Sequence, residues 1–468
     1  MKTKIKFVLI MLILLCTSCK QKTVDKLEIS INSIKGDINI NNGYLVIEQG
    51  GVYTLRGLIN NGSVVIRTKE DVKLILDGIK VKSDSNGAIV LEEKANLIIE
   101  SEKNSNNYLE DSNKRGDGTK NYNATIYSKG KLTLQGEGYL EVRGNYNDGI
   151  NCKKSVSIKS GNYKVVSKQD GIQASNDIII ENGNFEINTI GYEKIDSSNY
   201  AFGGYDKASD GSKKGLKADE NIYINDGIFV FYTIDDAIYS KREISVIVAK
   251  MNINTYDDAI HADNKITIEN GEYVIERCYE GIEAVDIVIE NGSYRINAMD
   301  DGINANSKYK EEKSLEDIRY SELVIHDGDF IINAYGDGID SNGNITINMG
   351  NFVIDCTEDV LDYDNEINVF DINLIGFSTE FLLLPNNFNT STNMVIFNFN
   401  KQVGKNSKIN IIGSDTNLSY VNRINAFSIL IINSGLKNNY DYYIEVNDEK
   451  VLDFSINQEL MYFGRERG

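Results

Sequence analysis

Acidic residues that could bind a cation recur at regular intervals in this 468-residue chain. Asp236, Asp258, Glu280 and Asp301 each begin the same motif, an acidic residue followed by Gly or Ala and then Ile, at intervals of 21 or 22 residues. Carboxylates, together with Asn side chains and backbone carbonyls, are the oxygen ligands that Ca²⁺ accepts. The spacing therefore predicts a row of calcium ligands if the fold stacks successive repeats on one another.

Several repeats carry a further carboxylate beside the first or a few residues downstream. The predicted calcium ligands are Asp235, Asp236, Asp257, Asp258, Asp263, Glu280, Glu283, Asp300, Asp301, Asp337, Asp340, Asp359, Asp362 and Asp364. His261, inside one of these repeats, is predicted to contribute to a site or to an exposed surface that contacts a ligand.

Two readings of this acidic row are open. Like charges about 5 Å apart repel by about 1 kcal/mol in water and by more at lower dielectric, so bound cations would stabilise a stack of carboxylates. The alternative is that each Asp is a solvated turn residue whose side chain bonds its own backbone.

A second marker follows the same interval and identifies the elements that must position these side chains. Each member is a Gly with Tyr or Phe two residues later, preceded by two apolar residues that flank a third, such as Ile222 and Ile224 before Gly227 and Phe229. Alternating β-branched residues closed by Asn-Gly or Asp-Gly predict a strand and a tight turn. The repeat therefore predicts an all-β fold, a parallel β-helix with about 22 residues and three short strands per coil. Stacked Ile and aromatic side chains are predicted to form its core.

The N-terminal segment predicts export, and the limits of the repeat predict how the chain is divided into domains. Lys2, Lys4 and Lys6 precede the apolar run 7–15, which is typical of a signal peptide. The segment resembles bacterial lipoprotein signals, with Cys19 as the residue that receives lipid. We expect a signal peptide over 1–19, a tether over 20–30, a β-helix with its N-terminal cap over 31–370 and a β-rich cap or small domain over 371–468. The protein is expected to be exported and anchored to the membrane at the cell surface, with plain secretion as the alternative.

Composition narrows the choice of partner. The formal net charge of −20 opposes nucleic-acid binding, which needs clustered Lys and Arg. Cys152, Cys278 and Cys356 show no paired spacing and are predicted to be buried. The chain has no Trp, which weakens stacking on neutral glucans. The sequence leaves the oligomeric state open.

The repeats resemble those of a known family. Its motifs occur in order at Lys213–Asp219, Asp257–Asp263, Tyr279–Glu283, Asp300–Ala305, Gly336–Gly343 and Leu361–Asp364. They are similar to the bacterial exported carbohydrate-binding domain-containing family of the clostridial cellulose- and polygalacturonate-binding type. The resemblance covers roughly residues 62–364. It implies a right-handed parallel β-helix that binds Ca²⁺ and an acidic plant polysaccharide such as polygalacturonate or pectin, without catalysis. Lys214 departs from the acidic row, as the family motif also does.

Two other functions stay open. One is a polysaccharide lyase or hydrolase of the β-helix type, for which Asp257 with Asp258 could imitate a catalytic pair. The recurrence of Asp-Asp suits a repeat better than a unique catalytic centre, and the Arg-x-Pro-x-x-Arg signature of pectate lyases is absent because Pro385 is the only Pro. The other is a structural surface or adhesion protein that calcium makes rigid.

Overall fold

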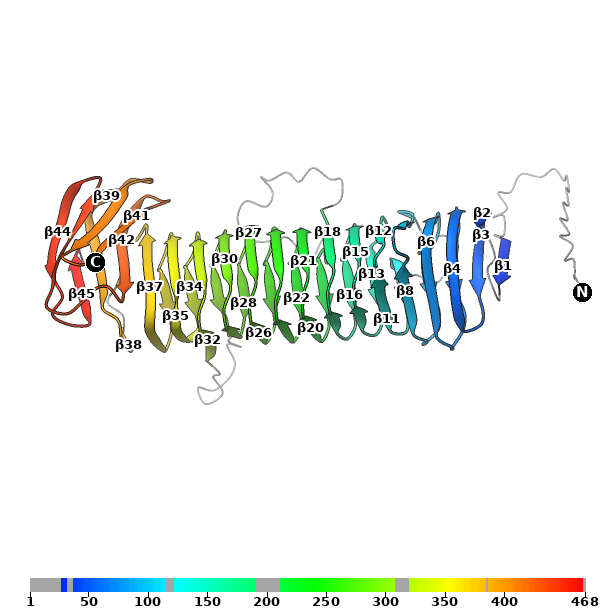
Figure 1. Cartoon of the computed structure of the whole chain (residues 1–468), viewed down its shortest axis with the longest axis horizontal. Coiled ribbons are helices and arrows are strands. Elements are labelled where there is room, and N and C mark those ends of the chain that lie inside the picture. The colour runs from blue at the N-terminus through cyan, green and yellow to red at the C-terminus, as the bar shows by residue number, and fades with distance from the viewer. Residues whose placement is uncertain are drawn as a thin grey trace, which may run out of the picture.

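The computed structural model describes residues 27–31, 37–114, 122–190, 211–307, 320–383 and 386–465. These residues form strands and turns without any helix, which confirms the all-β prediction. The chain winds into an elongated stack of coils that ends in a β-rich C-terminal unit (Figure 1). Within the described ranges, no helix has the length and apolar character needed to cross a membrane.

One side of every coil belongs to a single sheet, called here the first sheet, of 14 strands. Its strands, each parallel to the next, are β1 Leu27–Ile31, β3 Gly43–Ile47, β5 Ser63–Ile66, β7 Ile89–Leu91, β10 Ala124–Ser128, β13 Asp148–Cys152, β16 Ile172–Ala174, β19 Leu216–Ala218, β22 Ile238–Ser240, β25 Ile260–Ala262, β28 Ile282–Ala284, β31 Ile303–Ala305, β34 Ile339–Ser341 and β36 Leu361–Tyr363. The strands β13 to β36 contain the Ile or Leu of the acidic motifs.

The other two sides of each coil form two columns of parallel strands. One column contains β8 Leu97–Ser101, β11 Leu132–Gly136, β14 Val156–Ile158, β17 Ile178–Ile180, β20 Asn221–Ile224, β23 Glu243–Val246, β26 Lys265–Ile268, β29 Asp286–Ile289 and β32 Ser321–Ile325. The other contains β2 Ile38–Asn41, β9 Asn106–Glu110, β12 Tyr139–Gly144, β15 Asn162–Ser167, β18 Asn184–Asn188, β21 Ile228–Tyr232, β24 Lys250–Asn254, β27 Glu272–Cys278, β30 Ser293–Ala298 and β33 Asp329–Asn333. The longer strands β4 Gly51–Asn60, β6 Val72–Lys82, β35 Gly343–Cys356 and β37 Glu366–Ser378 run through both columns.

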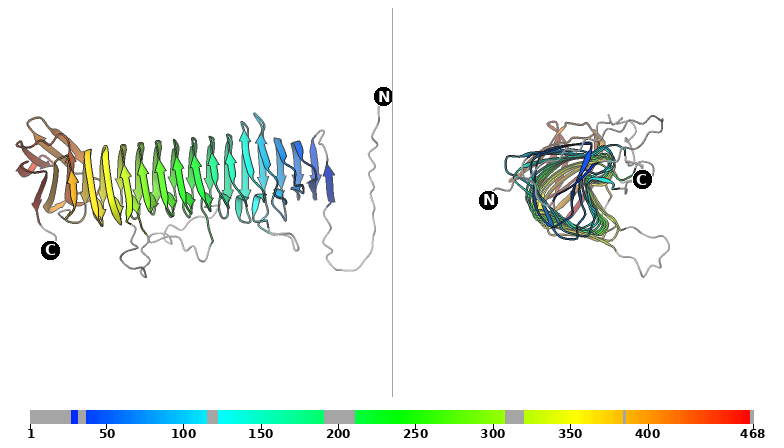
Figure 2. Two further views of the ribbon diagram at one scale, coloured as in Figure 1. Left: turned by 90° about the horizontal axis from the view of Figure 1, so that it is seen from below. Right: turned by 90° about the vertical axis from the view of Figure 1, so that its right-hand side faces the viewer.

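This arrangement is a parallel β-solenoid of about 14 turns with roughly 22 residues per coil, as the repeat predicts. The coils superimpose when viewed along the long axis (Figure 2). Each coil in the middle of the stack contributes one strand to the first sheet and one to each column, for example β22, β23 and β24. Equivalent residues of neighbouring coils therefore lie opposite one another along the whole solenoid.

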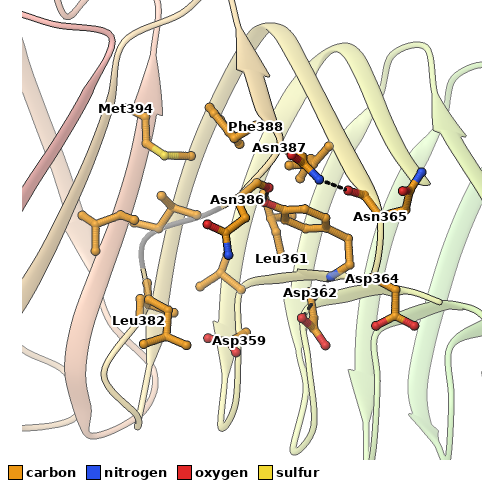
Figure 3. Close-up of a pocket in the computed structure, with 16 residues that line it drawn as sticks. Asp359, Leu361, Asp362, Asp364, Asn365, Leu382, Asn386, Asn387, Phe388 and Met394 are labelled. Atoms are coloured by element: carbon orange, nitrogen blue, oxygen red, sulfur yellow. Dashed lines mark hydrogen bonds between the residues drawn. The ribbon is translucent and has the colours of Figure 1, made fainter. Parts of the chain in front are cut away.

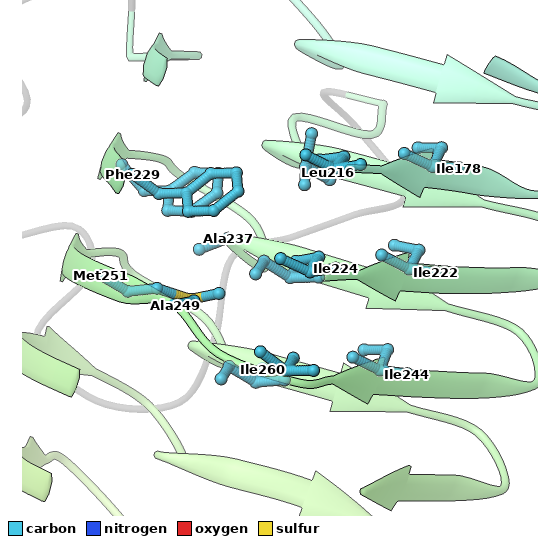
Figure 4. Close-up of a cluster of buried hydrophobic side chains, with 14 of the residues drawn as sticks. Ile178, Leu216, Ile222, Ile224, Phe229, Ala237, Ile244, Ala249, Met251 and Ile260 are labelled. Carbon is cyan, nitrogen blue, oxygen red and sulfur yellow. The ribbon is translucent and has the colours of Figure 1, made fainter. Parts of the chain in front are cut away.

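The core consists of side chains stacked from coil to coil. Ile178, Ile222 and Ile244 stack on one another in successive coils, and Met251 takes the place of an aromatic ring after Phe229 (Figure 4). The aromatic residues of the second marker are buried, with neighbouring ring centroids 4.6 to 5.3 Å apart within Tyr163, Phe185 and Phe229 and within Tyr273, Tyr294, Phe330 and Phe352. The prediction that these rings form the core is confirmed, so they offer no platform to a sugar.

The Gly of the second marker is required by the turn. Gly271 has a φ of 146°, in the region that favours glycine. A Cβ at this position would lie 2.4 Å from the carbonyl oxygen of Ala249 in the previous coil. The turn therefore brings the backbones of two coils too close together for any other residue.

A C-terminal unit of eight strands follows the last coil among the described residues. Its strands are β38 Phe388–Thr390, β39 Met394–Val403, β40 Lys408–Gly413, β41 Asn417–Val421, β42 Ala426–Asn433, β43 Asp441–Val446, β44 Glu449–Ser455 and β45 Leu460–Gly464. The second half of β37 pairs antiparallel with β42, and a four-stranded sheet of β41, β40, β43 and β44 packs next to it. An ion pair between the partly exposed Arg423 and the buried Asp355, with Nε and Oδ2 2.7 Å apart, joins this unit to β35 of the solenoid.

Candidate functional site

Two rows of side chains run along the outer face of the first sheet. The anchor row consists of the first residues of the motifs: Asp148, Asp170, Lys214, Asp236, Asp258, Glu280, Asp301, Asp337 and Asp359. The strand row lies three residues later, at the middle of each strand, and its members are aligned by the register: Asn151, Gln173, Lys217, Tyr239, His261, Glu283, Asn304, Asp340 and Asp362. Because the inward side chains of these strands fill the core, the strand row faces outward, next to the anchor row.

The carboxylates of the anchor row are largely removed from solvent. Asp236 is 0% exposed, Asp258 4% and Glu280 8%. An Asp in a fully solvated turn would show much greater exposure, so the solvated-turn explanation does not hold for these positions.

One oxygen of several anchor carboxylates joins neighbouring coils. The backbone N–H of Glu280 donates to Asp258 Oδ1 at 3.1 Å, and the N–H of Asp359 donates to Asp337 Oδ1 at 2.6 Å. Asp301 accepts from the N–H of Asp337 in the same way at 2.7 Å. The anchor residue thus has a structural function in the stack.

The two rows bring together five groups that could hold a metal ion. Within each group the candidate ligand atoms lie within 4.8 Å of one another. The groups are Asp235, Asp236 and Asp257; Asp236, Asp258 and His261; Asp258, Glu280 and Glu283; Glu280, Asp300 and Asp301; and Asp337, Asp340 and Asp362. All of their members except His261 were predicted calcium ligands, and His261 was the predicted ligand-contacting residue.

The remaining predicted residues lie outside these groups. Asp263 accepts a hydrogen bond from the Tyr239 hydroxyl at 3.1 Å, and Asp359 and Asp364 lie beside the last strand of the first sheet, where they line a cavity. Cys19, the predicted lipidation site, is outside the described residues, as is the whole predicted signal peptide.

Basic side chains neutralise the first part of the anchor row. Lys214 is buried, and its Nζ contacts Asp236 and lies 2.6 Å from Asp235 Oδ1. The same ammonium lies 4.3 Å from the centre of the Tyr239 ring. One step earlier, Lys217 pairs with Asp170 at 3.0 Å. Lys214 interrupts the acidic row in the sequence, and in the structure its ammonium group occupies the position of a cation between two carboxylates.

His261 neutralises the middle of the row. Its Nδ1 lies 3.1 Å from Asp258 Oδ2, 3.2 Å from Glu283 Oε2 and 3.6 Å from Asp236 Oδ2. Burial by itself would lower the pKa of His261, but the contact with Asp258 and the charges of Asp236 and Glu283 outweigh it and raise the pKa to about 9. The imidazole is therefore held as a cation among three carboxylates.

The last part of the row has no such partner. Among the described residues, no Lys, Arg or His forms an ion pair with Glu280, Asp301, Asp337, Asp340 or Asp362. Burial, followed by the charges of neighbouring carboxylates, raises the pKa of Glu280 to about 10, of Asp337 to about 8 and of Asp340 to about 7. Without a counter-ion these groups would have to hold protons at neutral pH.

Two buried oxygen atoms in this part of the row lack a hydrogen-bond partner in the described structure. They are Glu280 Oε2 and Asn304 Oδ1, on side chains that are 8% and 5% exposed. A buried acceptor that is left unpaired costs about 1–3 kcal/mol. Both atoms belong to the neighbourhood of the Glu280, Asp300 and Asp301 group, which therefore has the character of a site that is completed by a ligand.

Asp148 was missed as a member of the site. It is 2% exposed, and burial followed by the charge of Asp170 raises its pKa to about 8. Asn151 Nδ2 donates to its Oδ2 at 2.8 Å. The signal was present in the sequence, because Asp148 and Asp170 start two of the motifs, but they have no second carboxylate nearby.

The fold and the site together define a class of protein: a parallel β-solenoid with a row of buried carboxylates on one face. A family model described as "Carbohydrate-binding domain-containing protein" matches residues 41–205, 156–259 and 249–367, which together span most of the solenoid. The chain belongs to this carbohydrate-binding domain-containing family.

Two known proteins are similar to the chain. A carbohydrate-binding domain-containing protein of Acetivibrio thermocellus is 27% identical over 146 residues, which are 30% of this chain and 51% of that protein. The chain thus spans about half the length of this relative. A solved structure, described as a polysaccharide lyase-like protein from C. thermocellum in a gadolinium derivative, is 23% identical, with a TM-score of 0.43 over 52% of this chain and 96% of that one.

Proposed function

We propose that this protein binds an acidic polysaccharide, most simply polygalacturonate or pectin, in a calcium-dependent way and without catalysis. Membership of a carbohydrate-binding family supports the general class of ligand. The observation that carries the calcium dependence is the buried Glu280 carboxylate, whose Oε2 has no partner among the described residues and whose neighbours are also acidic.

The donors fit calcium. Glu280, Asp300 and Asp301 form one oxygen-only group, with the Asn304 amide oxygen nearby, and Asp337, Asp340 and Asp362 form another. Ca²⁺ takes six to eight oxygen ligands in flexible geometry, and an incomplete set leaves positions for ligand oxygens. Each of these two groups would hold a Ca²⁺ ion, and each ion would supply a positive charge that a carboxylate of the glycan can share.

The arrangement also suits a polymer. Strands of neighbouring coils lie about 4.8 Å apart, so the candidate cation positions repeat along a line, as the carboxylates of a polyuronate do. A chain of net charge −20 repels such a polyacid unless divalent cations lie between them. The glycan would therefore lie along the two rows.

Retention on immobilised polygalacturonate, with calcium or with a chelator, tests this function. We expect retention only with calcium, and loss of it in the double variant Asp337→Asn, Asp340→Asn. The double variant Asp329→Asn, Asp371→Asn, which neutralises two exposed carboxylates on β33 and β37, is the charge-matched control and should be retained. Equal retention with chelator would contradict the bridging role of calcium. A rise in thermal stability with calcium but no retention would favour a structural protein that calcium makes rigid.

A polysaccharide lyase is the second candidate, and one observation favours it. Lys214, a possible base, is buried next to the group formed by Asp235, Asp236 and Asp257. Its ammonium is shared between two carboxylates, which favours a counter-ion over a base. Release of unsaturated sugar ends from polygalacturonate, abolished in Lys214→Met, would establish the lyase.

We also propose that the protein is exported and anchored by lipid at Cys19. The apolar segment before Cys19 and the basic residues ahead of it support this proposal. Labelled fatty acid should enter the wild-type protein in cells and should not enter Cys19→Ala. Labelling of both would contradict the assignment, and release of an unlabelled wild-type protein into the medium would indicate plain secretion.

A further inference from the structure

A cavity lies where the two rows of the candidate site end. It has a volume of about 250 Å³ and is formed between the last coil and the start of the C-terminal unit (Figure 3). On the solenoid side it is lined by residues 359–365, which include β36, the final strand of the first sheet. On the other side it is lined by Leu382, Leu383 and residues 386–388. The chain beyond the last coil therefore forms a wall across the end of the rows.

The lining has two distinct sides. Asp359, Asp362 and Asp364 lie in a row along one edge of the cavity, and Phe388 and Met394 lie away from that edge (Figure 3). Asp362 belongs at the same time to the group with Asp337 and Asp340. A ligand in the cavity would thus touch apolar carbons on one side and would reach a candidate cation position on the other.

Residues at the mouth keep the cavity open to solvent. Leu383 is 53% exposed, and Asp362, Asp364 and Asn386 are also exposed. The Asn387 side chain donates to the carbonyl oxygen of Asn365 at 3.0 Å, and the Tyr363 hydroxyl donates to the carbonyl oxygen of Asn386. These two hydrogen bonds tie the wall to the last coil, so the cavity is a fixed feature of the junction.

A single sugar ring matches this combination of size and chemistry. The volume is below the range of about 300–1,000 Å³ that is usual for drug-sized ligands. A sugar has an apolar face of C–H groups, which suits Leu383 and Phe388, and hydroxyl groups at its edge, which suit Asp364 and Asn386. A uronate also has a carboxylate that can reach a cation at Asp362.

We propose that this cavity binds the terminal sugar of the polysaccharide, so that the protein recognises a chain end as well as the chain itself. The proposal rests on the proposed function, because the rest of the chain would lie along the anchor and strand rows. The wall that contains Leu382 and Leu383 would stop the polysaccharide from continuing past the last coil of the protein. One of the two chain ends, reducing or non-reducing, fits the cavity, and the experiment decides which.

Calorimetry with short oligogalacturonides in the presence of calcium tests this proposal. Three probes are compared: oligomers with both ends intact, oligomers with a reduced reducing end, and oligomers with an unsaturated non-reducing end. We expect the wild-type protein to bind one of the two modified probes about tenfold more weakly than the intact one, which corresponds to about 1.4 kcal/mol. Equal affinity for all three would overturn the proposal.

Two variants locate the effect in the cavity. Leu383→Ala with Asp364→Asn removes exposed lining groups, and Asn386→Trp fills the mouth. Both changes are at the surface, so the variants are expected to fold, which circular dichroism and thermal unfolding would check. Each variant should bind intact and end-modified oligomers with equal affinity, and a variant that keeps the preference would overturn the proposal.

Failure of the proposed function is distinguishable from failure of this inference. Calcium-dependent retention of long polygalacturonate by the wild-type protein depends on the anchor and strand rows. Long polymers have few chain ends, so the cavity contributes little to this retention. If that retention is absent, both proposals fall. If it is present without end preference, only the chain-end site is refuted.

Discussion

Lys214 places its ammonium group 2.6 Å from Asp235 Oδ1, on the next coil of the solenoid. It also contacts Asp236, which is fully buried. A side chain of the protein thus supplies the positive charge at this position, whereas no basic side chain among the described residues pairs with Asp301 or Asp337 farther along the row. This contrast divides the anchor row into a part that is neutralised by the chain and a part that needs another cation.

Replacing Lys214 by Met should remove the ammonium group that the buried carboxylates of Asp235 and Asp236 share. Breaking a buried ion pair costs about 3–5 kcal/mol, so we expect a loss of this size in the free energy of unfolding without calcium. Calcium should restore part of it and should bind with one additional equivalent. Denaturant unfolding and calorimetry measure both effects. Lys241→Met, which removes an exposed pair with Asp219, should cost at most about 1 kcal/mol.

Neutralising Glu280 should have the opposite effect on the calcium-free protein. Glu280→Gln keeps the size of the side chain, and the native state no longer has to take up a proton at this position, so the melting temperature without calcium should rise at neutral pH. Calcium affinity should fall at the same time, because a predicted ligand has lost its charge. Differential scanning calorimetry with and without calcium checks both. The exposed Glu276→Gln should change neither, and a lowered melting temperature in Glu280→Gln would contradict the assignment.

The stability of the calcium-free protein should fall as the pH rises. Burial raises the pKa of Asp301 to about 6, of Asp340 to about 7 and of Asp337 to about 8, above the usual value of 3.8. The native state then holds protons that the unfolded chain has released, and stability decreases through these values. His261, with its pKa raised to about 9, adds stability that is complete below pH 6.5 and is lost as the pH passes about 9.

Thermal unfolding between about pH 6 and pH 9 measures this dependence. We expect a decreasing melting temperature in chelator and a much flatter profile with calcium, because the cation takes over the role of the protons. A melting temperature that increases over this range in chelator would refute the interpretation.

The aromatic stack should be a main source of solenoid stability. Phe330 is 1% exposed, and its ring centroid lies 4.6 Å from that of Tyr294 and 4.7 Å from that of Phe352. Phe330→Ala should lower the free energy of unfolding by about 3–5 kcal/mol, as denaturant unfolding would show. Tyr335→Ala, at a ring that is 63% exposed, should change it by about 0.5 kcal/mol or less.

The sequence repeat predicts most of the solenoid. Three features of the repeat define the coils because each is a local requirement of a strand or a turn. They are the 22-residue interval, the alternating β-branched residues of each strand, and the Gly two residues before each aromatic residue. They also identify the acidic row and most of its members. The C-terminal unit was expected only as a β-rich region, since no repeat specifies how β37 pairs with β42.

The sequence by itself determined which carboxylates stack, because the register of a parallel solenoid follows from equal spacing along the chain. Only the tertiary structure decided which of them need a cation. Lys214 reaches forward to the next coil and His261 lies among three carboxylates, and neither contact can be read from spacing because it depends on side-chain direction and burial. The same holds for the cavity beside Asp362, which is lined both by the last strand of the first sheet and by residues 382, 383 and 386–388 that follow the last coil.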